Sequence, residues 1–258
     1  MPVKKYQEFI PHFTLQDSVK RFWLLEKEYT AEDRIEEVTP DACVELILNG
    51  NPYSVIGGSA KRELPNVCLV GLLAKPLRLK AEGLVKIVAV RFFAWGAFAF
   101  LENAAGRTDV TNVDLDPTWQ QVVQRARVLV QGENYQKAVE EIEDFLIGLR
   151  LNILFDPKQV RTAAKLLYHT RGQFRVAELA DYCQLSVRQL QRQFDQTTGV
   201  SPKALARAIR FESIRERLMF DPNANLTDLA LRIWLHRPGA LHQRLQSSHR
   251  QNSGRIRS

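Results

Sequence analysis

Hydrophobic residues change their spacing after about residue 105. Before that point they form short runs separated by turn residues such as Asn49-Gly50 and Gly57-Gly58, a pattern typical of short antiparallel strands in a barrel or sandwich. An aromatic cluster closes this part, and we interpret it as core or domain interface rather than a ligand pocket. The expected strands are Cys43–Leu48, Tyr53–Ile56, Val67–Leu72, Leu77–Lys80 and Leu84–Phe93, and the cluster contains Phe92, Phe93, Trp95, Phe98 and Phe100.

Helical spacing takes over at Asp116-Pro117, a capping residue followed by a proline suited to a first turn. One helix is expected from Thr118 to about Val130, where Gly132 ends it. A second helix has apolar positions at helical spacing, namely Val139, Ile142, Phe145, Leu146 and Leu149. This pair of helices is consistent with a spacer between domains, a dimer seam or packing on the β-rich part.

The chain from Asp156-Pro157 onward is expected to be entirely helical, and residues 174–195 have the pattern of a helix-turn-helix. The first helix of this motif buries Val176, Leu179 and the small Ala180, which lets the two helices cross closely. Leu185 fills the corner, and Ser186 stands where an N-cap residue belongs.

The next helix is expected to bury Val187, Leu190 and Phe194, which follow one another at i, i+3 and i+7. Its opposite face carries Arg188, Gln191 and Arg192. Arg pairs bidentately with guanine and Gln with adenine in the major groove, so this face suits base contacts better than simple solvation. Gln184 falls in the turn where a positive φ is expected, which costs a non-glycine residue about 1–2 kcal/mol.

A long helix from about Lys203 to Met219 comes next. Gly199 ends the preceding helix, Ser201 caps the new one and Pro202 occupies its first turn. Its apolar side contains Leu205, Ile209, Ile214 and Leu218, and its basic residues are expected to be available for phosphates: Lys203, Arg207, Arg210, Arg215 and Arg217.

Charge is distributed unevenly, although the net charge is only +7. Residues 1–150 carry 18 Lys+Arg and 21 Asp+Glu, whereas residues 151–258 carry 18 and 8. A basic half joined to a slightly acidic half favours nucleic acid binding at one end.

The stretch from about Phe155 resembles the DNA-binding domain of AraC/XylS-type transcription regulators. The matching residues are Ala180, Leu185-Ser186, Leu190 to Arg192, Phe194, Thr198-Gly199, Ser201-Pro202 and Leu226 to Ala230. In that family one long helix joins two helix-turn-helix units, and each unit places a helix in the major groove. The resemblance implies base contacts by Arg188, Gln191 and Arg192. From the residues themselves, we expect Ser186, Lys203 and Arg207 to position the phosphate backbone. Gln184 departs from the usual glycine. Pro40 to Asn49 resembles, more weakly, the β-rich sensor domain of such regulators.

We therefore expect an α+β protein in three parts. A β-rich, cupin-like barrel or sandwich for sensing or dimerisation spans residues 1–110, and a helical linker spans 111–154. A double helix-turn-helix domain spans 155–258, with units at about 174–195 and 222–245.

The second unit loses its pattern after Ile233. The segment Trp234–Ser258 holds three His, five Arg and no acidic residue, and Pro238-Gly239 stands where a recognition helix belongs. Suitable synonymous codons for this segment, translated one base later, give GYTDQAHFISDFKALTGKTPAEFA. This peptide repeats the first unit, because its Phe, Thr-Gly and Pro match the spacing of Phe194, Thr198-Gly199 and Pro202. We interpret the segment as the product of one extra base near the Ile233 and Trp234 codons; the alternative is a divergent basic tail.

The functional interpretation is a sequence-specific, effector-responsive transcription regulator. One alternative is a frameshifted regulator with impaired DNA binding that retains only a ligand- or partner-binding β-domain. Another is a cupin-type metalloenzyme, but His12 is the only histidine before His169, so a histidine-rich metal cluster cannot form there. No P-loop or GxSxG motif occurs. We thus expect no catalytic residue, metal or cofactor.

Expected partners are double-stranded DNA and, from the resemblance, a small-molecule effector, RNA polymerase and a second copy of the chain. No apolar run reaches the roughly 20 residues of a membrane span, and the first residues lack a signal-peptide core. Cys43, Cys68 and Cys183 form no CxxC pair. These features predict a cytoplasmic, nucleoid-associated protein with no membrane partner.

Overall fold

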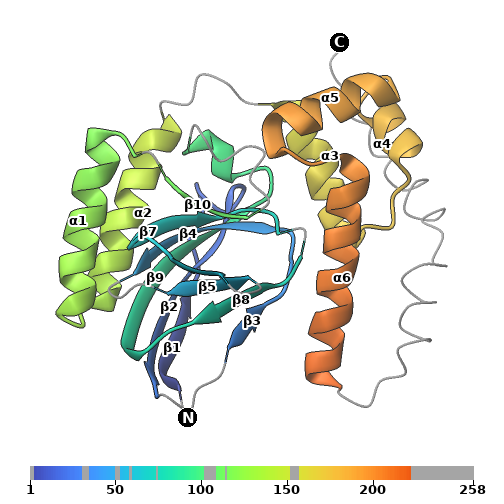
Figure 1. The fold of residues 1–258 in the computed structure, drawn as a ribbon. Coiled ribbons are helices and arrows are strands. Elements are labelled where there is room, and N and C mark those ends of the chain that lie inside the picture. The colour runs from blue at the N-terminus through green and yellow to red at the C-terminus, as the bar shows by residue number, and fades with distance from the viewer. Residues whose placement is uncertain are drawn as a thin grey trace.

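A computed structural model describes residues 3–30, 35–49, 53–57, 60–73, 75–101, 109–113, 115–151 and 157–221. Within these residues the protein is α+β, with antiparallel strands in the N-terminal part and helices after residue 116. Figure 1 shows the strands between two groups of helices, α1 and α2 on one side and α3 to α6 on the other. Residues 222–258, and with them the second helix-turn-helix unit and the inferred frameshift, lie outside the described residues.

The described strands form two sheets. The larger has the order β1-β2-β9-β4-β7-β10 and the smaller the order β3-β8-β5-β6. The larger sheet consists of β1 (Val3–Phe9), β2 (Val19–Tyr29), β9 (Gly83–Phe93), β4 (Cys43–Asn49), β7 (Val67–Val70) and β10 (Val110–Asn112). The smaller consists of β3 (Glu36–Val38), β8 (Leu77–Lys80), β5 (Ser54–Gly57) and β6 (Ala60–Glu63). The expected strands between Cys43 and Phe93 are confirmed within one to two residues at their ends.

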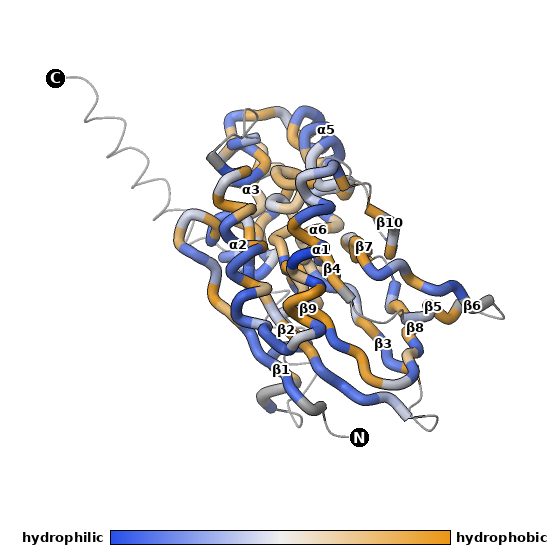
Figure 2. Tube along the Cα trace, turned by 90° about the vertical axis from the view of Figure 1, so that its left-hand side faces the viewer, coloured by the Kyte–Doolittle hydropathy of each residue, from blue (hydrophilic) through white to orange (hydrophobic). Residues whose placement is uncertain are grey.

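Both faces of the larger sheet are buried at its centre. Along β2, Phe22 and Leu24 face the main core, whereas Trp23 and Leu25 pack against a second cluster that includes residues of the smaller sheet. The central pairing of β2 with β9 extends from Val19 opposite Phe92 to Tyr29 opposite Gly83. Figure 2 shows hydrophobic residues over most of β9, which crosses the middle of the molecule.

The helices α1 (Pro117–Gln131) and α2 (Tyr135–Leu151) pack against this sheet. Asp116 caps α1 as expected, accepting hydrogen bonds from the backbone N–H groups of Thr118 and Trp119. The Trp119 Nε1–H donates to the Phe100 carbonyl at 3.1 Å, and the Tyr135 hydroxyl donates to Glu26 at 2.6 Å. Of the three arrangements considered for this pair, the structure therefore shows packing on the β-rich part.

Four further helices are described in the C-terminal part: α3 (Lys158–His169), α4 (Val176–Tyr182), α5 (Val187–Thr198) and α6 (Pro202–Phe220). The apolar stripe of α3 is fully buried, as its spacing predicts, with Val160, Ala163, Ala164 and Leu167 each 0% exposed. Leu179, Leu190 and Phe194 are buried in the same core. No helix among the described residues has the length and apolarity needed to cross a membrane.

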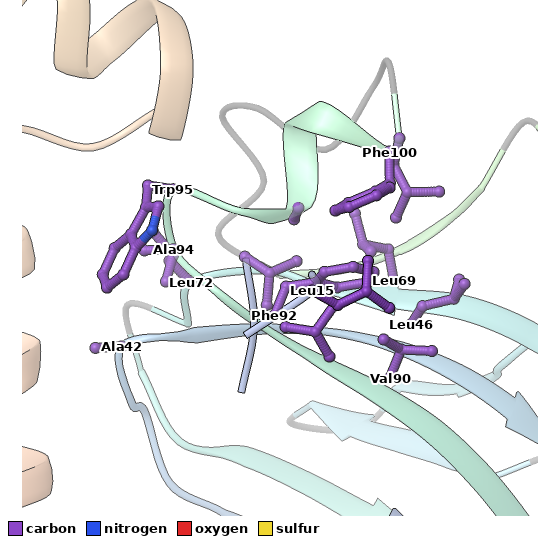
Figure 3. Close-up of a cluster of buried hydrophobic side chains, with 14 of the residues drawn as sticks. Leu15, Ala42, Leu46, Leu69, Leu72, Val90, Phe92, Ala94, Trp95 and Phe100 are labelled. Carbon is purple, nitrogen blue, oxygen red and sulfur yellow. The ribbon is translucent and has the colours of Figure 1, made fainter. Parts of the chain in front are cut away.

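The aromatic cluster at the end of β9 contributes both to the hydrophobic core and to the domain interface, the two roles expected for it. Phe92 and Phe100 stack inside the core of the β-rich part, with ring centroids 5.7 Å apart, whereas Phe93 and Trp95 stack at 4.6 Å and both meet the ring of Tyr168 on α3. In Figure 3, Trp95 lies apart from the Phe92 cluster, on the side of the C-terminal helices. These rings join the two halves of the molecule.

Glycine at position 96 is required by a close backbone approach. A Cβ atom there would lie 2.2 Å from the Ser18 carbonyl oxygen, whereas a Cβ at Gly148, an exposed position in the last turn of α2, would meet nothing within 4 Å. We expect Gly96→Ala to lower the free energy of unfolding by about 1–3 kcal/mol. Gly148→Ala should raise it by about 0.5–1 kcal/mol. Urea denaturation of the two variants measures both effects, and a change of the same sign in both would contradict this account.

Candidate nucleic-acid interface

The turn between α4 and α5 has the geometry expected from the sequence. Gln184 has a φ of 56°, which confirms the positive φ predicted for this position. The Leu185 N–H donates to the Ala180 carbonyl at 2.9 Å, so the chain reverses tightly between the helices. Ala180 is 1% exposed, and its small side chain permits the close crossing of α4 and α5. Leu185 is half-buried against the same core.

Ser186 caps α5 in a reciprocal arrangement. Its Oγ accepts the Gln189 N–H at 3.2 Å, and the Gln189 Oε1 accepts the Ser186 N–H at 2.9 Å. This capping box satisfies two backbone donors that a helix start otherwise leaves unpaired. The first turn of α5 is therefore held in place by local bonds.

The two faces of α5 differ sharply. Leu190 and Phe194 are 0% exposed, whereas Arg188, Gln191 and Arg192 are all exposed. The expectation that Val187 is buried is wrong, since it is 40% exposed. Val187 is the first residue of α5 and lies beyond the core that begins at Leu190. The exposed Arg and Gln side chains, together with Ser186, lie on a surface that the described residues leave uncovered.

The start of α6 follows the same local rules. Gly199 ends α5 in the left-handed region with a φ of 70°, and the Ser201 Oγ accepts the Ala204 N–H at 3.2 Å. Lys203 and Arg207 are exposed. The ends of α5 and α6 that face solvent thus carry both backbone N–H groups and basic side chains.

Two of the five basic residues of α6 that were expected to be available for phosphates bind protein acceptors. The Arg210 Nη1–H donates to the Gly172 carbonyl at 2.5 Å, and the Arg215 Nη1–H donates to the Thr39 hydroxyl at 2.6 Å. Both side chains are half-buried. Part of the positive charge of α6 is therefore directed to acceptors within the protein.

Sequence reasoning missed a buried cluster of charges between the two halves. Glu212 of α6 lies 2.8 Å from Lys20 of β2 and 3.8 Å from Arg91 of β9. Arg91 also pairs with Asp41 and, at 3.0 Å, with Glu45. Burial raises the pKa of the Asp41 and Glu45 carboxyls above their ordinary values, although Arg91 opposes both shifts. No local pattern marks Glu212, whose partners are distant in the chain.

Replacement of Gln184 tests the backbone strain in the turn. We expect Gln184→Gly to raise the free energy of unfolding by up to about 1 kcal/mol, because glycine removes the left-handed penalty but is more flexible when unfolded. Gln184→Ala is the matched control, since alanine keeps the penalty. Urea denaturation midpoints compare the two. Equal midpoints for the glycine and alanine variants would show that the turn is not strained.

Two family models match the chain. One, described as a domain of unknown function (DUF6597), matches residues 7–114, and one described as a helix-turn-helix domain matches residues 179–249. Curated proteins give no match. Among solved structures, ToxT from Vibrio cholerae O395 is 10% identical with a TM-score of 0.44, over 82% of this chain and 87% of that chain. The AraC-like transcriptional activator CuxR is 13% identical with a TM-score of 0.31, over 79% and 77% of the two chains.

The helix-turn-helix match covers the capped turn, the buried face of α5 and the long helix that follows. These are the elements that carry the motif residues from Ala180 to Pro202. The match therefore identifies a helix-turn-helix domain in the C-terminal half of the chain.

Proposed function

We propose that α5 enters the major groove of double-stranded DNA and that Arg188, Gln191 and Arg192 contact base edges there. The observation that carries this proposal is the division of α5 into a fully buried face and an exposed face of Arg and Gln. Guanine and adenine offer the acceptor and donor pairs that these side chains match bidentately. The other face of the helix anchors it in the core, so the contacting side chains project from a rigid support.

Ser186, Lys203 and Arg207 are proposed to position the phosphate backbone. Ser186 and Lys203 lie at the starts of α5 and α6, where unpaired N–H groups and the helix dipole favour an anion. Arg207 is exposed one turn further along α6. Phosphate contacts fix the register of a protein on DNA without selecting a sequence, so these residues complement the base contacts of α5.

We further propose the division into a β-rich domain at residues 1–110, a helical segment at 111–154 and a DNA-binding domain at 155–258. The β-rich domain would respond to a small-molecule effector, and the regulator would act in the cytoplasm. A groove of about 470 Å³ between the halves supports an effector response. Leu72, Leu73 and Pro76 form one wall of this groove, and Ala204, Ala208 and Phe211 of α6 the other, so a molecule in it would touch both halves.

Substitutions on α5 and α6 should have different effects on DNA binding. A preferred duplex is first selected from a random library with the full chain. Arg192→Ala should then weaken binding to this duplex by about 1–3 kcal/mol and relax the preference at one base pair. Lys203→Ala should weaken binding to all duplexes alike and reduce the slope of log K against log salt by about 1.

Fluorescence anisotropy at several salt concentrations separates these two effects. Arg78→Ala is the control, because this exposed arginine lies on β8, far from α5 in the fold. Unchanged affinity and unchanged base preference in both Arg188→Ala and Arg192→Ala would refute the proposed base contacts.

Restoring the reading frame should strengthen DNA binding. On the frameshift interpretation, removal of one base at the junction of the Ile233 and Trp234 codons replaces the present tail with a second unit that repeats the first. Because each good base contact contributes about 1–3 kcal/mol, we expect the repaired protein to bind a selected duplex at least about tenfold more tightly and to protect a longer stretch of it. Footprinting and anisotropy compare the two proteins. Equal affinity and equal footprints would disprove the frameshift interpretation.

A further inference from the structure

Glu212 is a buried carboxylate on α6, a helix that also carries exposed basic residues. Its side chain is 5% exposed, although it lies on the same helix as the exposed Lys203 and Arg207. Nine positions separate Lys203 from Glu212, about two and a half turns, so the two side chains project from opposite sides of α6. One side of this helix is therefore open to solvent, and the other presents a carboxylate to the β-rich half.

In the β-rich half, two cationic side chains pair with this carboxylate. The Lys20 Nζ lies 2.8 Å from Glu212 and is 9% exposed, and an Arg91 Nη lies 3.8 Å away. Burial would lower the pKa of Lys20, but Cys43 and Glu212 outweigh it and hold this pKa above its ordinary value. Lys20 also lies over the Tyr168 ring of α3, 5.3 Å from its centroid. One lysine thus contacts two helices of the DNA-binding half.

A buried ion pair tolerates little change in geometry. Each charge loses its hydration on burial, and only a well-placed partner compensates for that loss. The stacked rings of Phe93, Trp95 and Tyr168 provide adhesion between the halves, but apolar contact is non-directional and permits sliding. The Glu212 pair restricts the interface to one position of α6.

A metal ion is a poor explanation of this cluster. Donor atoms of Asp41, Cys43 and Glu212 lie within 4.8 Å of one another, but Lys20 and Arg91 already pair with the two carboxylates. Burial also raises the pKa of the Cys43 thiol to about 12, so it is protonated at neutral pH. The two carboxylates of this group therefore already have cationic partners within the protein.

We propose that Glu212 is the positioning residue of this regulator: its pairing with Lys20 and Arg91 docks α6 on the β-rich half and thereby fixes the orientation of α5. The docking itself is independent of DNA, whereas its consequence for base contacts rests on the function proposed above. Breaking the pair should separate the halves while each half stays folded.

Two cysteines of the full chain provide the measurement. Cys43 is 2% exposed beside Glu212, and Cys68 is 3% exposed in the second core, away from the interface. Labelling by a small thiol reagent, followed site by site with mass spectrometry, therefore reports separation of the halves at Cys43 and unfolding of the β-rich half at Cys68. We expect Glu212→Gln to accelerate labelling of Cys43 on the order of a hundredfold, with Cys68 unchanged.

The Lys20→Met variant distinguishes two causes of faster Cys43 labelling, release of α6 and a lower pKa of the thiol. Loss of the Glu212 charge lowers the pKa of the Cys43 thiol and by itself favours labelling, whereas loss of the Lys20 charge does the opposite. Release of α6 predicts acceleration in both variants. The double variant Lys20→Met/Glu212→Gln should label more slowly than either single variant, because neither charge is left buried without its partner.

Asp17→Asn is the matched control in the same interface. Asp17 pairs with Lys165 of α3 at 2.6 Å, but their side chains are 51% and 32% exposed, so the change should alter Cys43 labelling by less than about fivefold. Unchanged labelling in Glu212→Gln, acceleration in only one of the two single variants, or equal acceleration at Cys43 and Cys68 would each overturn the proposal. Loss of DNA binding in Arg192→Ala with unchanged Cys43 labelling in Glu212→Gln would refute the docking role alone, and the reverse result would refute only the base contacts.

Discussion

The pairing of β2 with β9 is the constraint on which the rest of the molecule depends. These two strands are the longest described, and their ladder spans almost their full length. One face of the pair supports α1 and α2 through the main core, and the other faces the smaller sheet. Toward one end of the ladder, Lys20 and Arg91 meet the C-terminal helices. The same pairing thus organises the β-rich core and the seat of the DNA-binding half.

In the DNA-binding half, interactions between neighbouring residues define the helices more strongly than they define the strands of the β-rich half. Capping by Ser186 and Ser201, the left-handed Gly199 and the apolar spacing of α3 and α5 define its helices without help from distant residues. Its attachment to the β-rich half depends instead on a few specific contacts: the Tyr168 ring, the Glu212 carboxylate and the Arg215 guanidinium. A module of this kind is rigid inside, and its orientation is sensitive to the chemistry of one interface.

Charge in this protein has two separate uses. The excess of Lys and Arg after residue 150 predicts nucleic acid binding, but the structure turns Arg210 and Arg215 inward to protein acceptors. Arg188 and Arg192 remain exposed on α5. The net charge of the C-terminal half therefore overstates its attraction to DNA, because it includes basic side chains that bind acceptors within the protein.

The sequence by itself determined the features that depend on a few neighbouring residues. Helix starts at Asp116 and Ser186, the positive φ of Gln184 and most strands after residue 43 follow from caps, turn chemistry and apolar spacing. The strands β1 and β2 escaped individual prediction. Side chains on both faces of β2 pack against hydrophobic cores, so this strand lacks the alternation that identifies a half-buried strand. By contrast, β1 is an edge strand whose side chains are mostly exposed and polar.

Only the tertiary structure decided which side chains contact each other when the contacting residues are far apart in the chain. The packing of α1 and α2 on the sheet, the exposure of Val187 and the inward direction of Arg215 depend on which surfaces meet. The bond between Lys20 and Glu212 spans 192 positions. No local pattern encodes such a contact, since its stability comes from burial that exists only after both halves have folded and docked.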